Sequence, residues 1–316
     1  MQIGARGRWK QYSKFIIRRL AWIIKFKPNG EDYIIKEESA MGKLFYHYCS
    51  YEVFLSIIRS KCLWLTNIVK SNDSEEVKRI FEKTWRNLRN IILAKSGEIS
   101  NTSDIVSILD EQMNIEIQVD PPYGICFSKN RDLVQNWVMY GNNCKGIAMG
   151  FSSDLFLGIK NATPHPNSLL ENSLGFFDVV YDNSQVQKDI IENAIWYLLN
   201  YNNALGWVGT RTLFKHISSQ LKNPSFVDER EVRLIYYPDK EHSDTLNLSA
   251  PIKEDEHYNF PFINKQSICS LKEIIVGNSC EHTIIEIQKK LHDLGIKDVD
   301  VVPSECTYRS SANKAL

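Results

Sequence analysis

Two glutamates and an arginine stand close together in an otherwise apolar segment of the chain. The segment reads Asp228-Glu229-Arg230-Glu231-Val232-Arg233-Leu234-Ile235. It predicts a β-strand, whose side chains alternate between two faces, so that Glu229, Glu231 and Arg233 share one side. One interpretation is an edge strand whose charged face lies in water and discourages pairing with other chains. The other is a cleft floor where two carboxylates and a guanidinium meet a ligand.

Composition limits the classes of protein to be considered. The 316 residues are enough to bury a large core, and we predict one main domain. Lys plus Arg and Asp plus Glu both number 38, so the overall charge does not indicate a nucleic-acid coat. The seven cysteines are scattered and contain no C-x-x-C pair, which argues against a disulfide framework or structural zinc site. These features favour a reducing, cytoplasmic location.

The N-terminus differs from the rest of the chain because residues 1–27 carry basic side chains and no acid. The spacing over residues 9–27 predicts a cationic amphipathic helix, which Pro28-Asn29-Gly30 ends. Its apolar run is too short and too charged to span a bilayer. The helix is suited to an anionic membrane surface or to a partner protein, and it could equally pack on the chain's own domain. We therefore predict a helix and linker over 1–42 and a single α+β domain over 43–316.

Strand and helix patterns alternate through the remainder of the chain and predict an α+β fold. Asn130 is expected to cap the helix that contains Trp137 and Tyr140. The predicted strands are 43–48, 62–65, 124–128, 146–151, 177–181, 228–235, 271–276 and 298–302, and the predicted helices are 52–59, 75–95, 103–113, 133–140, 184–200, 207–221 and 282–294. The polar stretch 238–263 is expected to hold only short strands.

Taken singly, the remaining candidate residues all have a structural explanation. His47 lies between Tyr46 and Tyr48 and points to the opposite face of its strand, where a histidine is more often structural than catalytic. Tyr140 is three residues after Trp137, the spacing of a helix face in a core. No phosphate-binding glycine loop, H-E-x-x-H or G-x-S-x-G motif is present, and no carboxylate spacing favours a metal-dependent nuclease.

Taken in order, short motifs along the chain are more informative than any one of them. They are Phe45-Tyr46-His47-Tyr48-Cys49-Ser50, Leu63-Trp64-Leu65-Thr66, Asn72-Asp73-Ser74-Glu75-Glu76, Cys126-Phe127-Ser128, Trp137-Val138-Met139-Tyr140, Gly146-Ile147-Ala148-Met149-Gly150-Phe151, Val180-Tyr181, Lys222 seven residues before Glu229, and Ile274-Ile275-Val276-Gly277. This ordered set resembles the bacterial domain-of-unknown-function family 2971 from about Lys43 to the C-terminus. Cys49, Ser74 and Phe226 depart from the usual Thr, Pro and Trp at packing and turn positions.

That family in turn looks distantly like the ADP-ribosyltransferase fold. The resemblance implies two packed mixed or antiparallel β-sheets with surrounding helices and a cleft that holds NAD. It implies that His47 bonds the nicotinamide-side ribose, that Trp64 or Tyr140 stacks on the nicotinamide ring, and that Tyr48 belongs to the same cofactor-binding set. It implies a catalytic carboxylate, Glu231 first and Glu229 second, that stabilises the positive charge on the ribose as nicotinamide leaves.

Arg233 has two uses under this resemblance. It would orient the catalytic carboxylate, since both side chains lie on one strand face, or it would meet the pyrophosphate of NAD with two hydrogen bonds. The function implied is an NAD-dependent ADP-ribosyltransferase that modifies a nucleic acid or protein, as a bacterial toxin or anti-phage defence effector. An antitoxin is then one of the partners that residues 9–27 would bind. The alternative is a non-catalytic ligand- or partner-binding module that uses the same polar strand and the N-terminal helix.

Overall fold

We analysed a computed structural model of the chain, which describes most of the sequence after residue 42. The described residues are 43–68, 74–95, 97, 102–104, 106–107, 110–111, 122–153, 155, 173–182, 184–200, 219–237, 252–254, 256–263 and 267–308. The predicted N-terminal helix and linker over 1–42 and most of the predicted helix over 207–221 lie outside these residues.

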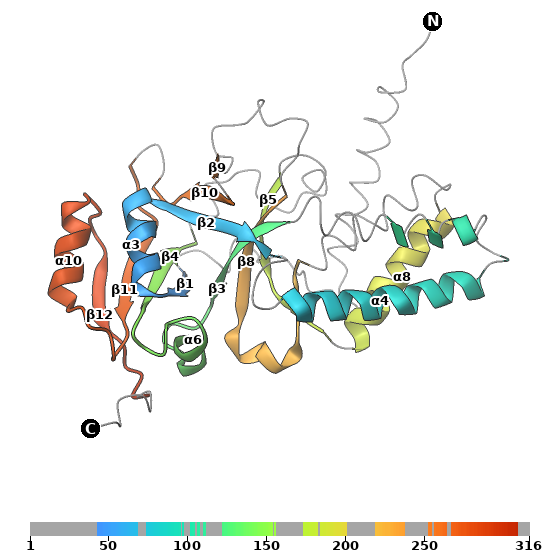
Figure 1. Cartoon of the computed structure of the whole chain (residues 1–316), viewed down its shortest axis with the longest axis horizontal. Coiled ribbons are helices and arrows are strands. Elements are labelled where there is room, and N and C mark those ends of the chain that lie inside the picture. The colour runs from blue at the N-terminus through green and yellow to red at the C-terminus, as the bar shows by residue number, and fades with distance from the viewer. Residues whose placement is uncertain are drawn as a thin grey trace, which may run out of the picture.

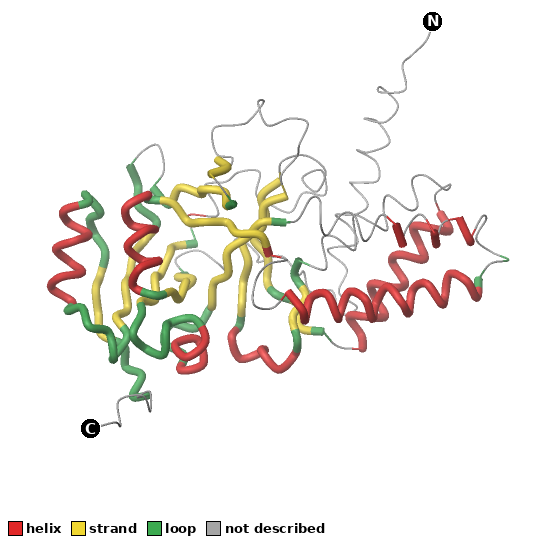
Figure 2. Tube along the Cα trace, in the orientation of Figure 1, coloured by secondary structure: helices red, strands yellow, loops and turns green. Residues whose placement is uncertain are grey.

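A ten-stranded mixed sheet forms the centre of the molecule (Figures 1 and 2). Its strands run in the order β12-β11-β4-β1-β3-β2-β10-β9, with β8 paired to β3 and β5 paired to β8. The bounds are β1 Leu44–Cys49, β2 Cys62–Asn67, β3 Tyr123–Ser128, β4 Ile147–Ser152, β5 Ser173–Asp178, β8 Glu231–Tyr237, β9 Ile252–Glu254, β10 His257–Pro261, β11 Leu271–Val276 and β12 Asp300–Pro303. Two further strands, β6 Val180–Tyr181 and β7 Leu221–Lys222, pair in parallel as a separate small sheet.

The sheet branches at β3, because one edge of β3 pairs with two different strands, β1 and β2. The space between these two strands can hold a site. On one edge β3 pairs with β8 along its whole length, from Tyr123 to Ser128. On the other edge β1 pairs only at Ser128, whereas β2 pairs only at Tyr123 and Gly124. Because β1 and β2 diverge, neither strand pairs with β3 over residues 125–127.

Helices cover the strands at both ends of the molecule. α3 Tyr51–Ser60 begins at Ser50, whose side chain caps the helix, and ends at Lys61 in the left-handed conformation. α10 Ile284–Asp293 begins with a capping box between Thr283 and Glu286. α10 lies beside β12 at one end, and α4 Ser74–Ala94 and α8 Ser184–Asn200 lie together at the other (Figure 1). No helix among the described residues is long and apolar enough to cross a bilayer.

Among the four apolar clusters of the described residues, two hold α3, α4, α8 and α10 in place. The larger one joins the strands of the branched sheet to α3 and α10 and includes Phe127, Phe151, Val232 and Leu234. The smaller one lies around α4 and α8 and includes Leu88, Ile92, Val106, Ile190, Ala194, Leu198 and Leu221. Val106 lies in the predicted helix over 103–113, and the side chain of Asp110 from the same segment accepts from Trp85 and Arg89 of α4.

The structure has a large mixed sheet and several helices, which confirms the predicted combination of helices and strands, but it does not confirm the two packed sheets that the resemblance implied. In the described residues the main strands connect into one branched sheet, because β3 pairs with strands on both of its edges. The predicted strand over 177–181 is divided between β5 and β6 at Val179, whose N–H donates to the carbonyl of Glu231 (3.0 Å). Leu221, predicted in a helix, belongs to β7.

The predicted strand over 228–235 is wrong at its start. Residues Pro224–Glu229 form a 3₁₀ helix, η3, which Asn223 caps and which ends at Arg230 in the left-handed conformation (φ 44°). Only then does β8 begin, at Glu231. The edge-strand interpretation is also wrong, because β8 pairs on both sides, with β3 and with β5, and is buried along its length.

Asn130 does not cap the following helix, α6 Val134–Met139. Leu133 occupies the N-cap position without a side-chain hydrogen bond. The Asn130 side chain instead donates to the carbonyl of Asp228 (2.7 Å). This contact ties the loop before α6 to η3, and both segments border the pocket described next.

Candidate functional site

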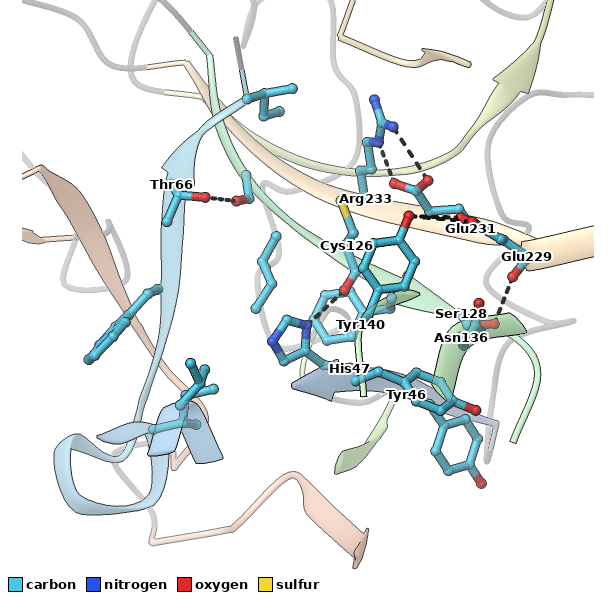
Figure 3. Close-up of a pocket in the computed structure, with 18 of the residues that line it drawn as sticks. Tyr46, His47, Thr66, Cys126, Ser128, Asn136, Tyr140, Glu229, Glu231 and Arg233 are labelled. Carbon is cyan, nitrogen blue, oxygen red and sulfur yellow. Dashed lines mark hydrogen bonds and ion pairs between the residues drawn. The ribbon is translucent and has the colours of Figure 1, made fainter. Parts of the chain in front are cut away.

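A pocket of about 440 Å³ lies where β1 and β2 diverge from β3 (Figure 3). Its walls come from β1, β2, α3, β3, α6, β7, η3 and β8. The lining residues that bear on its chemistry are Tyr46, His47, Tyr48, Trp64, Cys126, Ser128, Asn136, Tyr140, Lys222, Glu229, Glu231 and Arg233. The volume is within the range of about 300–1,000 Å³ that is typical of small-molecule sites.

One wall of the pocket is a buried cluster of four charged side chains. The ammonium of Lys222 donates to Oε2 of Glu229 (2.6 Å) and to Oε2 of Glu231 (2.7 Å). Arg233 donates from Nε to Oε1 of Glu231 (2.5 Å) and from its terminal nitrogens to Oε2 of Glu231 (3.4 Å) and the carbonyl of Ser219 (2.9 Å). Each of the four side chains is at most 5% exposed. Two cations therefore balance two carboxylates in a site that excludes most water.

Electrostatics keep this cluster ionised. Burial disfavours the charged form of Glu231, but the charges of Arg233 and Lys222 outweigh burial and lower its pKa to about 2. Burial also disfavours the Lys222 ammonium, yet the charge of Glu231 and the hydrogen bonds from both glutamates raise its pKa above the ordinary value. Lys222 is therefore a fixed cation, and Glu231 is a carboxylate throughout the physiological pH range.

Local structure explains why two glutamates that are two residues apart reach the same ammonium. Glu229 ends η3, and the left-handed Arg230 turns the chain before Glu231 starts β8. The Ser128 hydroxyl donates to the carbonyl of Glu229 (2.7 Å), and the backbone N–H of Glu231 donates to the hydroxyl of Tyr181 (3.1 Å). Both glutamate backbones are thus held by hydrogen bonds to neighbouring strands.

His47 lies on β1, across from the charged wall, where β1 and β2 diverge from β3. Its Nδ1 is 3.0 Å from the carbonyl oxygen of Cys126, which can only accept, so Nδ1 carries the proton. Burial lowers the pKa of His47, and the hydrogen bond to Cys126 offsets this only in part. The neutral ring therefore offers Nε2 as an acceptor. In the view of Figure 3, His47 and the Glu231–Arg233 pair lie on opposite sides of Cys126.

The thiol of Cys126 lies between these two walls and is exposed to the pocket, although its strand is central. Desolvation by the protein atoms around the pocket and the nearby charge of Glu231 raise its pKa above the ordinary value. A protonated thiol is a poor nucleophile. The hydroxyl of the neighbouring Ser128 already holds Glu229. Neither residue is therefore arranged as a catalytic nucleophile.

The three predicted aromatic residues make different contacts. The Tyr140 hydroxyl lies 3.3 and 3.4 Å from the two carboxylate oxygens of Glu229 and accepts from Lys222 at 3.5 Å. The Tyr48 hydroxyl donates to the carbonyl of Arg131 (2.9 Å), and its ring packs edge-on against Trp137. The Trp64 ring is tilted against the ring of His257, with centroids 4.8 Å apart. Tyr140 thus extends the acidic wall, whereas Tyr48 fixes the loop before α6.

All seven residues predicted for the site line this one pocket. Sequence reasoning placed Glu229 beside Glu231 for the wrong reason, since the two do not share a strand face. It assigned no role to Lys222 and did not consider Asn136. The Asn-Pro pair at Asn223-Pro224, a typical helix start, was the available signal for η3. Nothing in the sequence indicated that β7 would bring Lys222 to both glutamates.

The comparisons with known proteins agree with one part of the sequence prediction. Residues 136–234 match the family model described as "Protein of unknown function (DUF2971)". The predicted resemblance to this family, expected from about Lys43 to the C-terminus, is confirmed over these residues. The matched segment runs from Asn136 on α6 to Leu234 on β8 and so includes Tyr140, Lys222 and the whole charged wall. No curated protein and no solved structure matches the chain.

Proposed function

We propose that the protein is an NAD-dependent ADP-ribosyltransferase, which transfers ADP-ribose to a nucleic-acid or protein acceptor. The observation that carries the proposal is the presence of His47, Tyr140 and the ionised Glu231 in one pocket. These are the residue types that the resemblance to the transferase fold implies for ribose binding, nicotinamide stacking and charge stabilisation. Following the same resemblance, we propose a cytoplasmic bacterial toxin or anti-phage defence effector.

The lining residues fit NAD in their chemistry. The neutral His47 offers an acceptor to a ribose hydroxyl, and Tyr140 and Trp64 offer aromatic rings to the nicotinamide. Arg233 already bonds Glu231 through two nitrogens and the Ser219 carbonyl through the third. Of its two predicted uses, these contacts favour orientation of the carboxylate over contact with a pyrophosphate.

In the proposed reaction, the bond between the ribose C1′ and the nicotinamide nitrogen breaks, and its electron pair leaves with nicotinamide. A new bond forms from C1′ to a nucleophilic atom of the acceptor, which loses its proton. Glu231 stabilises the positive charge that develops on the ribose, and Lys222 and Arg233 hold its carboxylate in a fixed orientation. A preorganised group of this kind contributes about 3–4 kcal/mol to catalysis.

The test is an incubation of the full chain with NAD labelled in its ADP-ribose part, together with protein, DNA or RNA acceptors. The measurements are nicotinamide release and transfer of label. We expect Glu231→Gln to reduce turnover about 100- to 1,000-fold and Glu229→Gln to reduce it less. Glu273→Gln, a glutamate outside the pocket lining, is the matched control. Equal turnover in the wild type and both pocket variants would refute the proposal.

A second candidate is a non-catalytic ligand- or partner-binding module. The observation that favours it is that Lys222 and Arg233 already neutralise both glutamates. Under this alternative NAD is not consumed, Glu231→Gln keeps the function, and removal of residues 1–27 abolishes it. The same incubation, extended to a chain lacking these residues, distinguishes the two candidates.

A further inference from the structure

The side chain of Asn136 lines the pocket, where it lies near the Tyr48 hydroxyl. The residue is 2% exposed, and neither Oδ1 nor Nδ2 has a partner at hydrogen-bond distance in the part of the chain that the structure describes. An unsatisfied buried polar group costs about 1–3 kcal/mol. Such groups are uncommon in folded proteins, and a group of this kind that faces a pocket indicates a ligand.

The backbone around Asn136 is firmly held, so the side chain cannot easily turn away. The Asn136 carbonyl accepts from the N–H groups of Tyr140 (2.9 Å) and Gly141 (3.0 Å). The next residue, Trp137, is fully buried and donates from its ring to Asp132 (2.5 Å). The neighbours of Asn136 along the chain, Gln135 and Tyr140, both bond Glu229, and in the view of Figure 3 Asn136 appears at the same end of the pocket as Ser128. The free amide is therefore fixed next to the acidic wall.

The chemistry of the amide restricts what it can bind. A primary amide presents one acceptor and two donors in a plane, which matches a neutral, planar group that also carries a donor and an acceptor. A carboxylate would offer no donor to Oδ1 and would add a negative charge near Glu229, whose side chain already bonds Gln135 (3.5 Å) and Tyr140. The site therefore favours a carboxamide over the corresponding acid.

We propose that Asn136 binds the carboxamide of the nicotinamide group by a reciprocal pair of hydrogen bonds, an inference that rests on the proposed function. Asn136 is then a specificity-determining residue that separates NAD from its deamidated analogue, nicotinic acid adenine dinucleotide. Tyr140, one turn further along the chain, is positioned to contact the same part of the ligand.

The test is calorimetric binding of NAD, nicotinic acid adenine dinucleotide and ADP-ribose to the full chain. For Asn136→Leu we expect NAD affinity to fall about 10- to 100-fold, since two hydrogen bonds are lost, while affinity for ADP-ribose, which lacks the carboxamide, stays within about twofold. Asn136→Asp should weaken NAD binding through loss of the amide donor, and it should weaken binding of the deamidated analogue more, because two carboxylates would then face each other. Asn259→Leu is the control, because Asn259 carries the same side chain but lies outside the pocket lining.

The outcomes separate the two proposals. Melting temperatures measured alongside check folding, and Asn136→Leu should melt no lower than the wild type because it removes an unsatisfied buried amide. If NAD binds the wild type and Asn136→Leu equally well, the role of Asn136 is wrong while the proposed function stands. If the wild type binds neither NAD nor ADP-ribose, the proposed function fails and the role of Asn136 fails with it.

Discussion

Two clusters of oppositely charged residues lie close to β1 and β3, and their surroundings differ. In the first cluster, Arg131 donates hydrogen bonds to the Glu273 carboxylate from Nε and a terminal nitrogen (2.8–3.2 Å), and the Tyr46 hydroxyl donates to the same carboxylate (2.9 Å). The Arg131 side chain is 41% exposed. At the other, Lys222 is 1% exposed and bonds Glu229 and Glu231. The contacts are similar in type, but only the second cluster is buried throughout and brings charged side chains to the pocket wall.

The difference in burial between the two clusters changes what each contributes to the stability of the fold. A partly exposed ion pair such as Arg131–Glu273 is worth about 0–1 kcal/mol and costs little to form. A buried cluster pays a desolvation cost that its mutual attraction roughly cancels, so apolar residues in the same place are often at least as stable. Stability alone therefore does not explain why four charges are buried beside a pocket. A ligand that uses Glu231 does explain it.

The first prediction separates the two clusters by stability. Lys222→Met leaves Glu229 and Glu231 buried without their shared cation, and we expect a loss of about 3–5 kcal/mol in the free energy of unfolding. Arg131→Met, the matched change at the exposed cluster, should cost about 1 kcal/mol or less after allowance for solvent screening. Urea denaturation measures both. Equal losses in the two variants would contradict the distinction between the clusters.

The second prediction concerns acid. The pKa of Glu231 is lowered to about 2, from 4.5, so its ionised form favours the folded state. This contribution is complete above about pH 4.5 and is lost as the pH falls toward 2, on the order of 3 kcal/mol in total. The measurement is urea denaturation at a series of pH values for wild type and Glu231→Gln. The variant should lose less stability between pH 5 and the acid limit, and parallel curves would contradict the prediction.

The third prediction concerns His47, which is neutral and lies across the pocket from the charged wall. His47→Phe removes the hydrogen bond to Cys126 and the acceptor at Nε2, but keeps a planar ring of similar size. We expect NAD affinity to fall about tenfold, equivalent to about 1.4 kcal/mol, through loss of the contact to the ribose. Titration calorimetry measures it, with Tyr51→Phe outside the pocket lining as control. Unchanged affinity in His47→Phe would remove this histidine from the proposed site.

The smallest predicted effect is on thiol chemistry. Desolvation by the surrounding protein and the charge of Glu231 raise the pKa of Cys126, although this residue is exposed to the pocket. Alkylation of Cys126 by iodoacetamide at pH 8 should therefore be slower in the folded protein than in urea-unfolded protein. Glu231→Gln should make it faster, because it removes the nearby negative charge. Mass spectrometry of the tryptic peptide measures both rates. A folded-state rate above that of the unfolded chain would contradict this view of the pocket.

The sequence predicted much of this arrangement where the evidence was local. The alternation of side chains placed His47 on the face opposite its tyrosine neighbours, and the apolar pattern located β3, β4, β11 and α10 within a few residues. These predictions succeeded because a strand or helix of a few turns is largely determined by its own residues.

Other features depended on contacts between distant segments and were missed. The start of β8 was misplaced because the left-handed Arg230 interrupts what looks like continuous alternation. The central position of β8 was missed because charged residues on a strand usually face water, whereas here Lys222 from β7 neutralises them. Asn136 was overlooked because only a structure shows that a buried amide lacks partners.

The most direct measurement is the single-turnover rate of nicotinamide release at saturating NAD, in Glu231→Gln and Glu273→Gln beside the wild type. We predict that Glu231→Gln is at least about 100-fold slower with NAD affinity changed only a few fold, while Glu273→Gln matches the wild type. Release at the wild-type rate by Glu231→Gln would show that the buried carboxylate takes no part in breaking the glycosidic bond.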